Sequence, residues 1–177
     1  DESPAAWQKR VRTDLLKAEQ RLREELGETV NPGRLFAYPY GEYSRALAQL
    51  VRELGYTAFG QHSGAIGRHS DFAALPRYPM AEAYAKPEAF ALKVASLPLP
   101  VVEAQPWSPL LEDERVPPLR LRLAPGGRWS RLACYLGGEA LDVQWSEPDR
   151  RLRVEGPDTL PPGRSRYNCT APAADGR

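Results

Sequence analysis

The chain has 177 residues, with 24 lysine and arginine residues against 23 aspartate and glutamate residues, a formal net charge of +1. This length allows one large or two small domains, each with its own apolar core. No basic block runs along the chain, so the sequence does not favour nucleic acid as a partner. No apolar run approaches the roughly 20 residues that a membrane-spanning helix needs, so no membrane span is predicted.

The first predicted element is a long helix over residues 3–27. Ser3 is a suitable N-cap, Pro4 suits the first helical position, and Gly27 suits the C-terminal end. The apolar face, predicted to pack inward, consists of Trp7, Val11, Leu15, Ala18, Leu22 and Leu26. The polar side chains on the opposite face are predicted to be solvated and not to form a binding stripe.

A strand, a helix and a second strand follow in close succession. Residues 34–38 (RLFAY) and 56–60 (YTAFG) predict short strands, and residues 44–54 predict a helix that starts at Ser44 and ends before Gly55. The inward face of this helix is predicted to be Ala46, Leu47, Leu50, Val51 and Leu54. A strand–helix–strand unit of this length favours a parallel pair of strands.

Ligands of parallel sheets and barrels bind where the strands end, here at PYGEY and GQHSGAIG. Pro39 fixes the chain direction, Gly41 permits a close backbone approach, and Tyr40 offers a backbone N–H and a phenol. Such N–H groups could form an oxyanion hole for an attacked carbonyl. The same residues equally suit a tight turn leading into the second helix, and the residues alone leave both interpretations open.

Other catalytic groups have weaker support. His62, His69 and Asp71 are residue types that bind zinc, but their spacing is not typical of metal ligands, and we expect hydrogen-bonding surface groups. Ser63 lacks the GxSxG elbow of serine hydrolases. The glycines of residues 60–67 match neither the dinucleotide-binding fingerprint nor the P-loop.

Proline usage divides the chain. Three prolines fall in residues 1–75 and fifteen in residues 76–177. A boundary is predicted in residues 96–118, which carry six prolines and are expected to form an extended linker between residues 1–95 and 119–177. The last part is predicted to be an all-β sandwich because short, mostly alternating runs recur at 119–123, 129–136, 140–145, 151–155 and 164–170.

The two cysteines, Cys134 and Cys169, both lie in this β region. Trp145 follows the first by 11 residues, and Tyr167 stands two residues before the second, an arrangement typical of immunoglobulin-like domains. We predict an inter-sheet disulfide packed on the indole, and with it an oxidising compartment; two free buried thiols are the alternative. Asn168 fits a glycosylation pattern, which we discount inside a predicted strand. Only seven residues follow Thr170, so we expect a truncated sandwich.

The segment FAYPYGEYSRALAQLVRELGYTAFG, residues 36–60, resembles the third motif and following helix of the polysaccharide deacetylases, the NodB-homology group of carbohydrate esterases (family 4-like). LPRYPM at 75–80 is similar to a later part of such domains, so the resemblance covers roughly residues 5–95. It implies an α/β fold, part of a distorted (β/α) barrel, in residues 1–95. The β region would then be a small all-β immunoglobulin-like sandwich. In the family the PYG motif, here Pro39, Tyr40 and Gly41, lines the substrate groove, and the backbone N–H matching Tyr40 contacts the oxyanion.

The resemblance also implies a divalent metal, usually zinc, held by one Asp and two His, with a catalytic Asp as base and a late His as acid. The TFDD-like and HxxxH-like segments that supply these groups lie upstream of the first helix in the family, and this chain contains neither. Ala37 also replaces an arginine common in the third motif, and no late LxH segment is evident. We therefore expect the C-terminal part of a deacetylase domain plus most of its β module, without metal ligands and inactive alone.

The implied function is removal of acetyl groups from a polysaccharide by a periplasmic or secreted hydrolase. The alternative is a non-enzymatic carbohydrate-binding or cell-envelope module. Its aromatic side chains, such as Tyr38, Tyr40, Tyr43 and Trp107, could stack on sugar faces.

Overall fold

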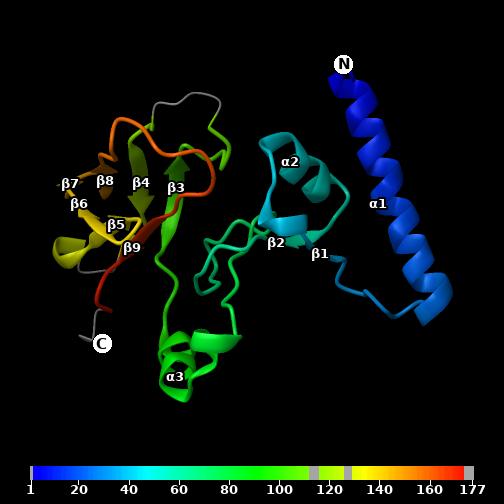
Figure 1. Cartoon of the computed structure of the whole chain (residues 1–177), viewed down its shortest axis with the longest axis horizontal. Helices are drawn as coiled ribbons and strands as arrows, with labels where there is room; N and C mark the ends of the chain where they lie inside the picture. The colour runs from blue at the N-terminus through cyan, green and yellow to red at the C-terminus, as the bar shows by residue number, and fades with distance from the viewer. Residues whose placement is uncertain (1, 112–115, 126–128, 174–177) are drawn as a thin grey trace. The chain divides into compact units, whose positions relative to one another are not determined.

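A computed structural model of the chain describes residues 2–111, 116–125 and 129–173 (Figure 1). Residues 112–115 of the predicted linker and 174–177 of the predicted β module lie outside the described residues. Within the described part the fold is mixed α/β, with three α-helices and several sheets, and no sheet closes into a barrel. No described helix has the length and apolar composition that crossing a membrane requires.

The chain divides into two compact units. The N-terminal unit contains the residues up to Gln61 together with Asp71–Leu75. The C-terminal unit contains His62–Ser70 together with the residues from Pro76 onward.

Helix α1 (Pro4–Leu26) confirms the first predicted element. The Ser3 hydroxyl accepts a hydrogen bond from the Ala6 N–H at 3.2 Å, and Gly27 ends the helix with φ 93°. The predicted apolar face is buried only in part, because Trp7, Val11 and Leu15 are half-buried whereas Ala18, Leu22 and Leu26 are exposed.

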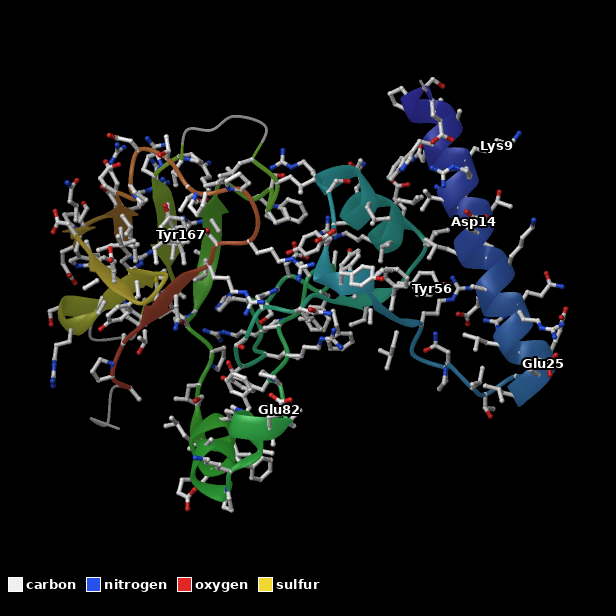
Figure 2. All side chains as sticks on the ribbon, viewed as in Figure 1. Lys9, Asp14, Glu25, Tyr56, Glu82 and Tyr167 are labelled. Carbon is white, nitrogen blue, oxygen red and sulfur yellow. A yellow bond between two sulfur atoms is a disulfide. The ribbon has the colours of Figure 1, made fainter. Side chains whose placement is uncertain are left out.

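The buried side chain of α1 is a carboxylate. Glu19 is 6% exposed and accepts hydrogen bonds from Arg23 at 3.3 Å, Asn31 at 3.2 Å and the hydroxyl of Tyr56 at 3.3 Å. Tyr56, which directly precedes β2, is labelled in Figure 2. A carboxylate can be buried when partners of this kind replace its hydration. These bonds fasten α1 to the segments that flank the sheet of the N-terminal unit.

Strands β1 (Leu35–Ala37) and β2 (Thr57–Phe59) form the predicted parallel pair, joined through helix α2 (Arg45–Glu53). The Ser44 hydroxyl caps α2 by accepting from the Leu47 N–H at 3.1 Å. Leu50 and Val51 are fully buried as predicted, whereas Ala46 is exposed and Ala48 takes the inward position.

The segment Asp71–Leu75 extends this sheet beyond β2. The Ala58 N–H donates to the Phe72 carbonyl at 2.8 Å, and the Leu75 N–H donates to the Ala58 carbonyl at 2.8 Å. Phe59 and Leu75 form a parallel bridge. The N-terminal unit therefore has three adjacent parallel segments.

The first helical elements of the C-terminal unit are a 3-10 turn, η2 (Glu82–Ala85), and helix α3 (Pro87–Ala95), and neither is predicted from the sequence. One sheet has the order β3 (Val101–Gln105), β4 (Leu119–Leu123), β8 (Arg151–Val154) and β7 (Val143–Ser146). The other has the order β6 (Glu139–Leu141), β5 (Ala133–Leu136) and β9 (Tyr167–Thr170), and a 3-10 turn, η3 (Trp129–Arg131), precedes β5. Strand β3 lies inside the segment expected to be a linker.

Both sheets contribute to one core. Its buried members are Leu121, Leu123, Leu132, Cys134, Leu152 and Val154. Trp145 of β7 is half-buried against this cluster. The immunoglobulin-like arrangement of the two sheets stays a prediction.

The predicted disulfide between Cys134 and Cys169 is present. Its predicted inter-sheet position is wrong, because the two cysteines face each other across β5 and β9, neighbouring strands of the same sheet. Side chains directly opposite on an antiparallel pair point to the same face, which brings the two sulfur atoms together. The bridge therefore fastens β9 to β5 and not one sheet to the other.

We predict that this bridge stabilises the C-terminal unit. Replacing both cysteines, Cys134→Ala with Cys169→Ala, should lower the free energy of unfolding by about 3–4 kcal/mol, because the bridge closes a loop with a sequence separation of 35 residues. Urea unfolding followed by tryptophan fluorescence measures the change. Reductant should destabilise the wild type and leave the double variant unaffected; equal midpoints for both proteins would contradict this role.

Candidate active site

The PYG motif forms a 3-10 turn, η1 (Pro39–Gly41), directly after β1. The Gly41 N–H donates to the Tyr38 carbonyl at 2.8 Å, and the Glu42 N–H donates to the Pro39 carbonyl at 3.1 Å. Tyr40 lies between these bonds in the left-handed region, with φ 57° and ψ 7°, and its side chain is 77% exposed. The Tyr40 N–H takes part in neither bond of the turn.

Gly41 brings the ends of the two strands together. Its φ is 71°, and a Cβ at this position would lie 2.6 Å from the Cβ of Gln61 and 2.8 Å from its backbone nitrogen. Gln61 follows β2 by two residues. The turn after β1 and the residues just after β2 therefore lie against each other. Gln61 lies in the strand-end segment GQHSGAIG but was not named there as a site residue.

Tyr38 supports the turn from inside the unit. Its side chain is 1% exposed, and its hydroxyl donates to the Ala73 carbonyl at 2.7 Å. The ring stacks on Tyr43 with centroids 4.6 Å apart, and the edge-to-face contact with Phe36 has centroids 5.3 Å apart. Burial foremost, then the nearby Tyr43 and Asp71, raises the pKa of Tyr38 to about 12.

The aromatic side chains that were considered for sugar stacking differ in their exposure to solvent. The assignment of Tyr38 to that role is wrong, because its ring is enclosed in the core. Tyr43 is half-buried on the Tyr38 ring, and Trp107 is half-buried in the C-terminal unit. Tyr40 presents most of its ring to solvent.

Asp71 has a structural role. Its carboxylate accepts from Arg52 Nη2 at 2.7 Å and from the Ala73 N–H at 2.9 Å. The first bond reaches helix α2, and the second folds the start of the segment that continues the sheet. Asp71 thus positions the Ala73 carbonyl that receives the Tyr38 hydroxyl.

His62 and His69 belong to the C-terminal unit, whereas Asp71 belongs to the N-terminal unit. His69 Nε2 accepts from the Nε of the adjacent Arg68 at 2.9 Å. His62 is exposed as a residue, but partial burial of its imidazole and then the charge of Arg166 lower its pKa. Among the residues that the structure describes, no group of three or more His, Cys, Asp or Glu side chains could hold a metal ion. The described residues therefore do not fit the Asp and two His metal centre that the family resemblance implies.

Comparison with known proteins identifies one relationship. Residues 3–59 match the family model of the polysaccharide deacetylases. The match runs from the N-cap of α1 to the end of β2 and includes the PYG turn, but it covers less than half of the chain. No curated protein and no solved structure matches the chain. The likeness noted at residues 75–80 lies outside the match and stays a prediction.

A matched pair of variants tests the close approach of Gly41 to Gln61. Gly41→Ala should cost about 1–3 kcal/mol more stability than Gly55→Ala. Gly55 also has a positive φ, 77°, but a Cβ there meets nothing within 4 Å, so the pair separates the clash from the strain. Urea unfolding followed by near-ultraviolet circular dichroism measures both. Equal losses would show that the two strand ends do not meet as described.

The raised pKa of Tyr38 predicts a pH dependence of stability. Because the folded pKa is about 12 and the unfolded value about 10, the contribution of the neutral phenol is complete below pH 10 and is lost as the pH rises to 12. The loss should be of the order of 2–3 kcal/mol. Tyr38→Phe, which cannot ionise, should lack it. Parallel stability curves for the two proteins from pH 9 to 12 would contradict the burial of this hydroxyl.

Proposed function

We propose that residues 1–95 form the later part of a polysaccharide deacetylase domain, a hydrolase that removes acetyl groups from a sugar polymer. The observation that carries this proposal is the family match over residues 3–59, which includes the PYG turn. In the proposed site, Pro39 and Gly41 shape the wall of the substrate groove. This assignment uses the exposed position of the turn at the carboxyl end of β1.

The proposed role of Tyr40 is electrostatic. Attack on an acetyl carbonyl places negative charge on its oxygen, and a fixed N–H donor stabilises that charge. The Tyr40 N–H suits this role because the turn's own hydrogen bonds are made by Gly41 and Glu42. The contacts of Tyr38 with Ala73 and Tyr43 and of Gly41 with Gln61 restrict the backbone conformation between them. The Tyr40 N–H therefore needs little reorganisation to act as a donor.

The metal of the proposed enzyme, zinc in most of the family, would come with ligands outside the described residues. In the family the metal-binding segments precede the helix that α1 matches. We therefore propose that they precede residue 3 in the complete protein. The present residues supply the wall and the oxyanion donor.

The disulfide between Cys134 and Cys169 supports a periplasmic or secreted location, since such bridges persist in oxidising compartments. The proposed immunoglobulin-like module would follow the catalytic domain in the same compartment. Its two sheets share one core, which is compatible with this assignment.

A carbohydrate-binding module without catalysis is the alternative. The observation that favours it is the exposure of Tyr40, the central residue of the turn, which is 77% exposed. An exposed aromatic ring can stack on the apolar face of a sugar. The two functions assign different atoms of the same residue, the backbone N–H for hydrolysis and the ring for binding.

Acetate release by the full-length protein from acetylated poly-N-acetylglucosamine tests the proposed function. We expect release that stops after chelation and returns with zinc. Replacing residue 40 by the α-hydroxy acid analogue of tyrosine removes the N–H and keeps the ring, and should lower kcat by about 10²–10³-fold.

The matched control is Tyr40→Asn, which keeps the N–H, tolerates the left-handed conformation and removes the ring. This variant should change kcat by less than about threefold, far less than the loss expected when the oxyanion donor is removed. The reverse pattern, with the Asn variant impaired and the ester variant active, would assign the residue to sugar stacking. Acetate release that persists after chelation would contradict a metal-dependent deacetylase.

A further inference from the structure

Four arginines occupy neighbouring positions on one face of the four-stranded sheet in the C-terminal unit. Arg120 of β4 lies opposite Arg153 of β8, and Arg122 of β4 lies opposite Arg151 of β8. The leucines that alternate with them on the two strands are buried in the core. Because side chains alternate between the faces of a strand, the arginines lie on the face away from that core. We call these four residues the arginine face.

The arginine face carries repulsion that its neighbours relieve only in part. Like charges directly opposite each other on paired strands are destabilising. Glu103 pairs with Arg122 at 2.6 Å and with Arg151 at 3.5 Å, and Glu155 pairs with Arg153. Arg120 is exposed and forms no ion pair with any residue that the structure describes. The face therefore keeps an excess of positive charge.

The same face is hollowed, with a volume of about 310 Å³. Besides the arginines, the polar side chains of its lining are Glu103, Gln105, Gln144 and Ser146. The register places Gln105, Arg120, Arg153 and Gln144 in one row across the four strands, and Glu103, Arg122, Arg151 and Ser146 in the next. Two arginines thus lie side by side in the middle of each row. Gln105 and Gln144 are at the edges of one row, and Glu103 and Ser146 are at the edges of the other.

We propose that the arginine face binds an anionic polysaccharide that bears carboxylate groups. Guanidinium groups match carboxylates in a bidentate geometry. The amides and the hydroxyl at the edges suit sugar hydroxyls. The two rows lie roughly 7 Å apart along the strands, so a polymer with repeated carboxylates can engage both. The choice of a glycan among polyanions rests on the proposed function.

Binding of the 177-residue chain to polygalacturonate tests this proposal, with neutral dextran and duplex DNA as comparison polymers. We expect affinity electrophoresis to show salt-sensitive binding of polygalacturonate, little retardation by dextran, and weaker binding of DNA at equal charge. Arg120→Gln should weaken polygalacturonate binding by about tenfold, the effect of losing one charge-assisted hydrogen bond. Arg131→Gln, an exposed arginine of the same unit outside the hollow, should leave binding unchanged.

Glu103→Gln gives a change of opposite sign. Removing this carboxylate releases Arg122 and Arg151 for the ligand, so polygalacturonate binding should strengthen by a few-fold, which loss of folding cannot imitate. Equal affinities for the wild type, Arg120→Gln and Glu103→Gln would overturn the proposal, as would equally tight binding of DNA. Either result, with zinc-dependent acetate release intact in the full-length protein, would leave the proposed deacetylase standing. Binding without acetate release would contradict the deacetylase alone.

Discussion

The buried phenol of Tyr38 is the constraint on which the candidate site depends. Its hydroxyl bonds the Ala73 carbonyl and its ring stacks on Tyr43, so one side chain joins the end of β1, the segment beyond β2 and the approach to α2. The PYG turn starts at the next residue, so the contacts of Tyr38 fix the position of its first residue. The close approach of Gly41 to Gln61 then sets the other side of the turn. Between these two fixed points stands Tyr40, whose conformation is strained and whose ring is exposed.

The C-terminal unit obtains its surface chemistry from the alternation of its strands. Leucines on β4 and β8 fill the core shared by the two sheets, and the alternate arginines are thereby presented on the opposite face. The disulfide fastens β9 to β5 within the smaller sheet, and the shared core holds the two sheets together. The two proposed contacts with glycans lie on separate units: the PYG turn belongs to the N-terminal unit and the arginine face to the C-terminal unit.

The sequence predicted the elements whose signals are local. The caps at Ser3 and Ser44, the helices they begin and the parallel pair of strands follow from neighbouring residues. Helix α3 was missed because its initiating Pro87 stands in a proline-rich region that favoured turns and extended chain. The cysteine pair was predictable, but its sheet depends on a register between distant strands. The burial of Tyr38 and the approach of Gln61 to Gly41 likewise arise from tertiary packing, as does the pairing of arginine with arginine.

The central claim is that the PYG turn supplies the oxyanion donor of a deacetylase. A structure of the full-length protein with a bound phosphinate, which imitates the tetrahedral intermediate, tests it most directly. We predict a phosphinate oxygen about 2.7–3.1 Å from the backbone nitrogen of Tyr40. A phosphinate bound to the metal with the Tyr40 nitrogen out of hydrogen-bonding reach would contradict the claim.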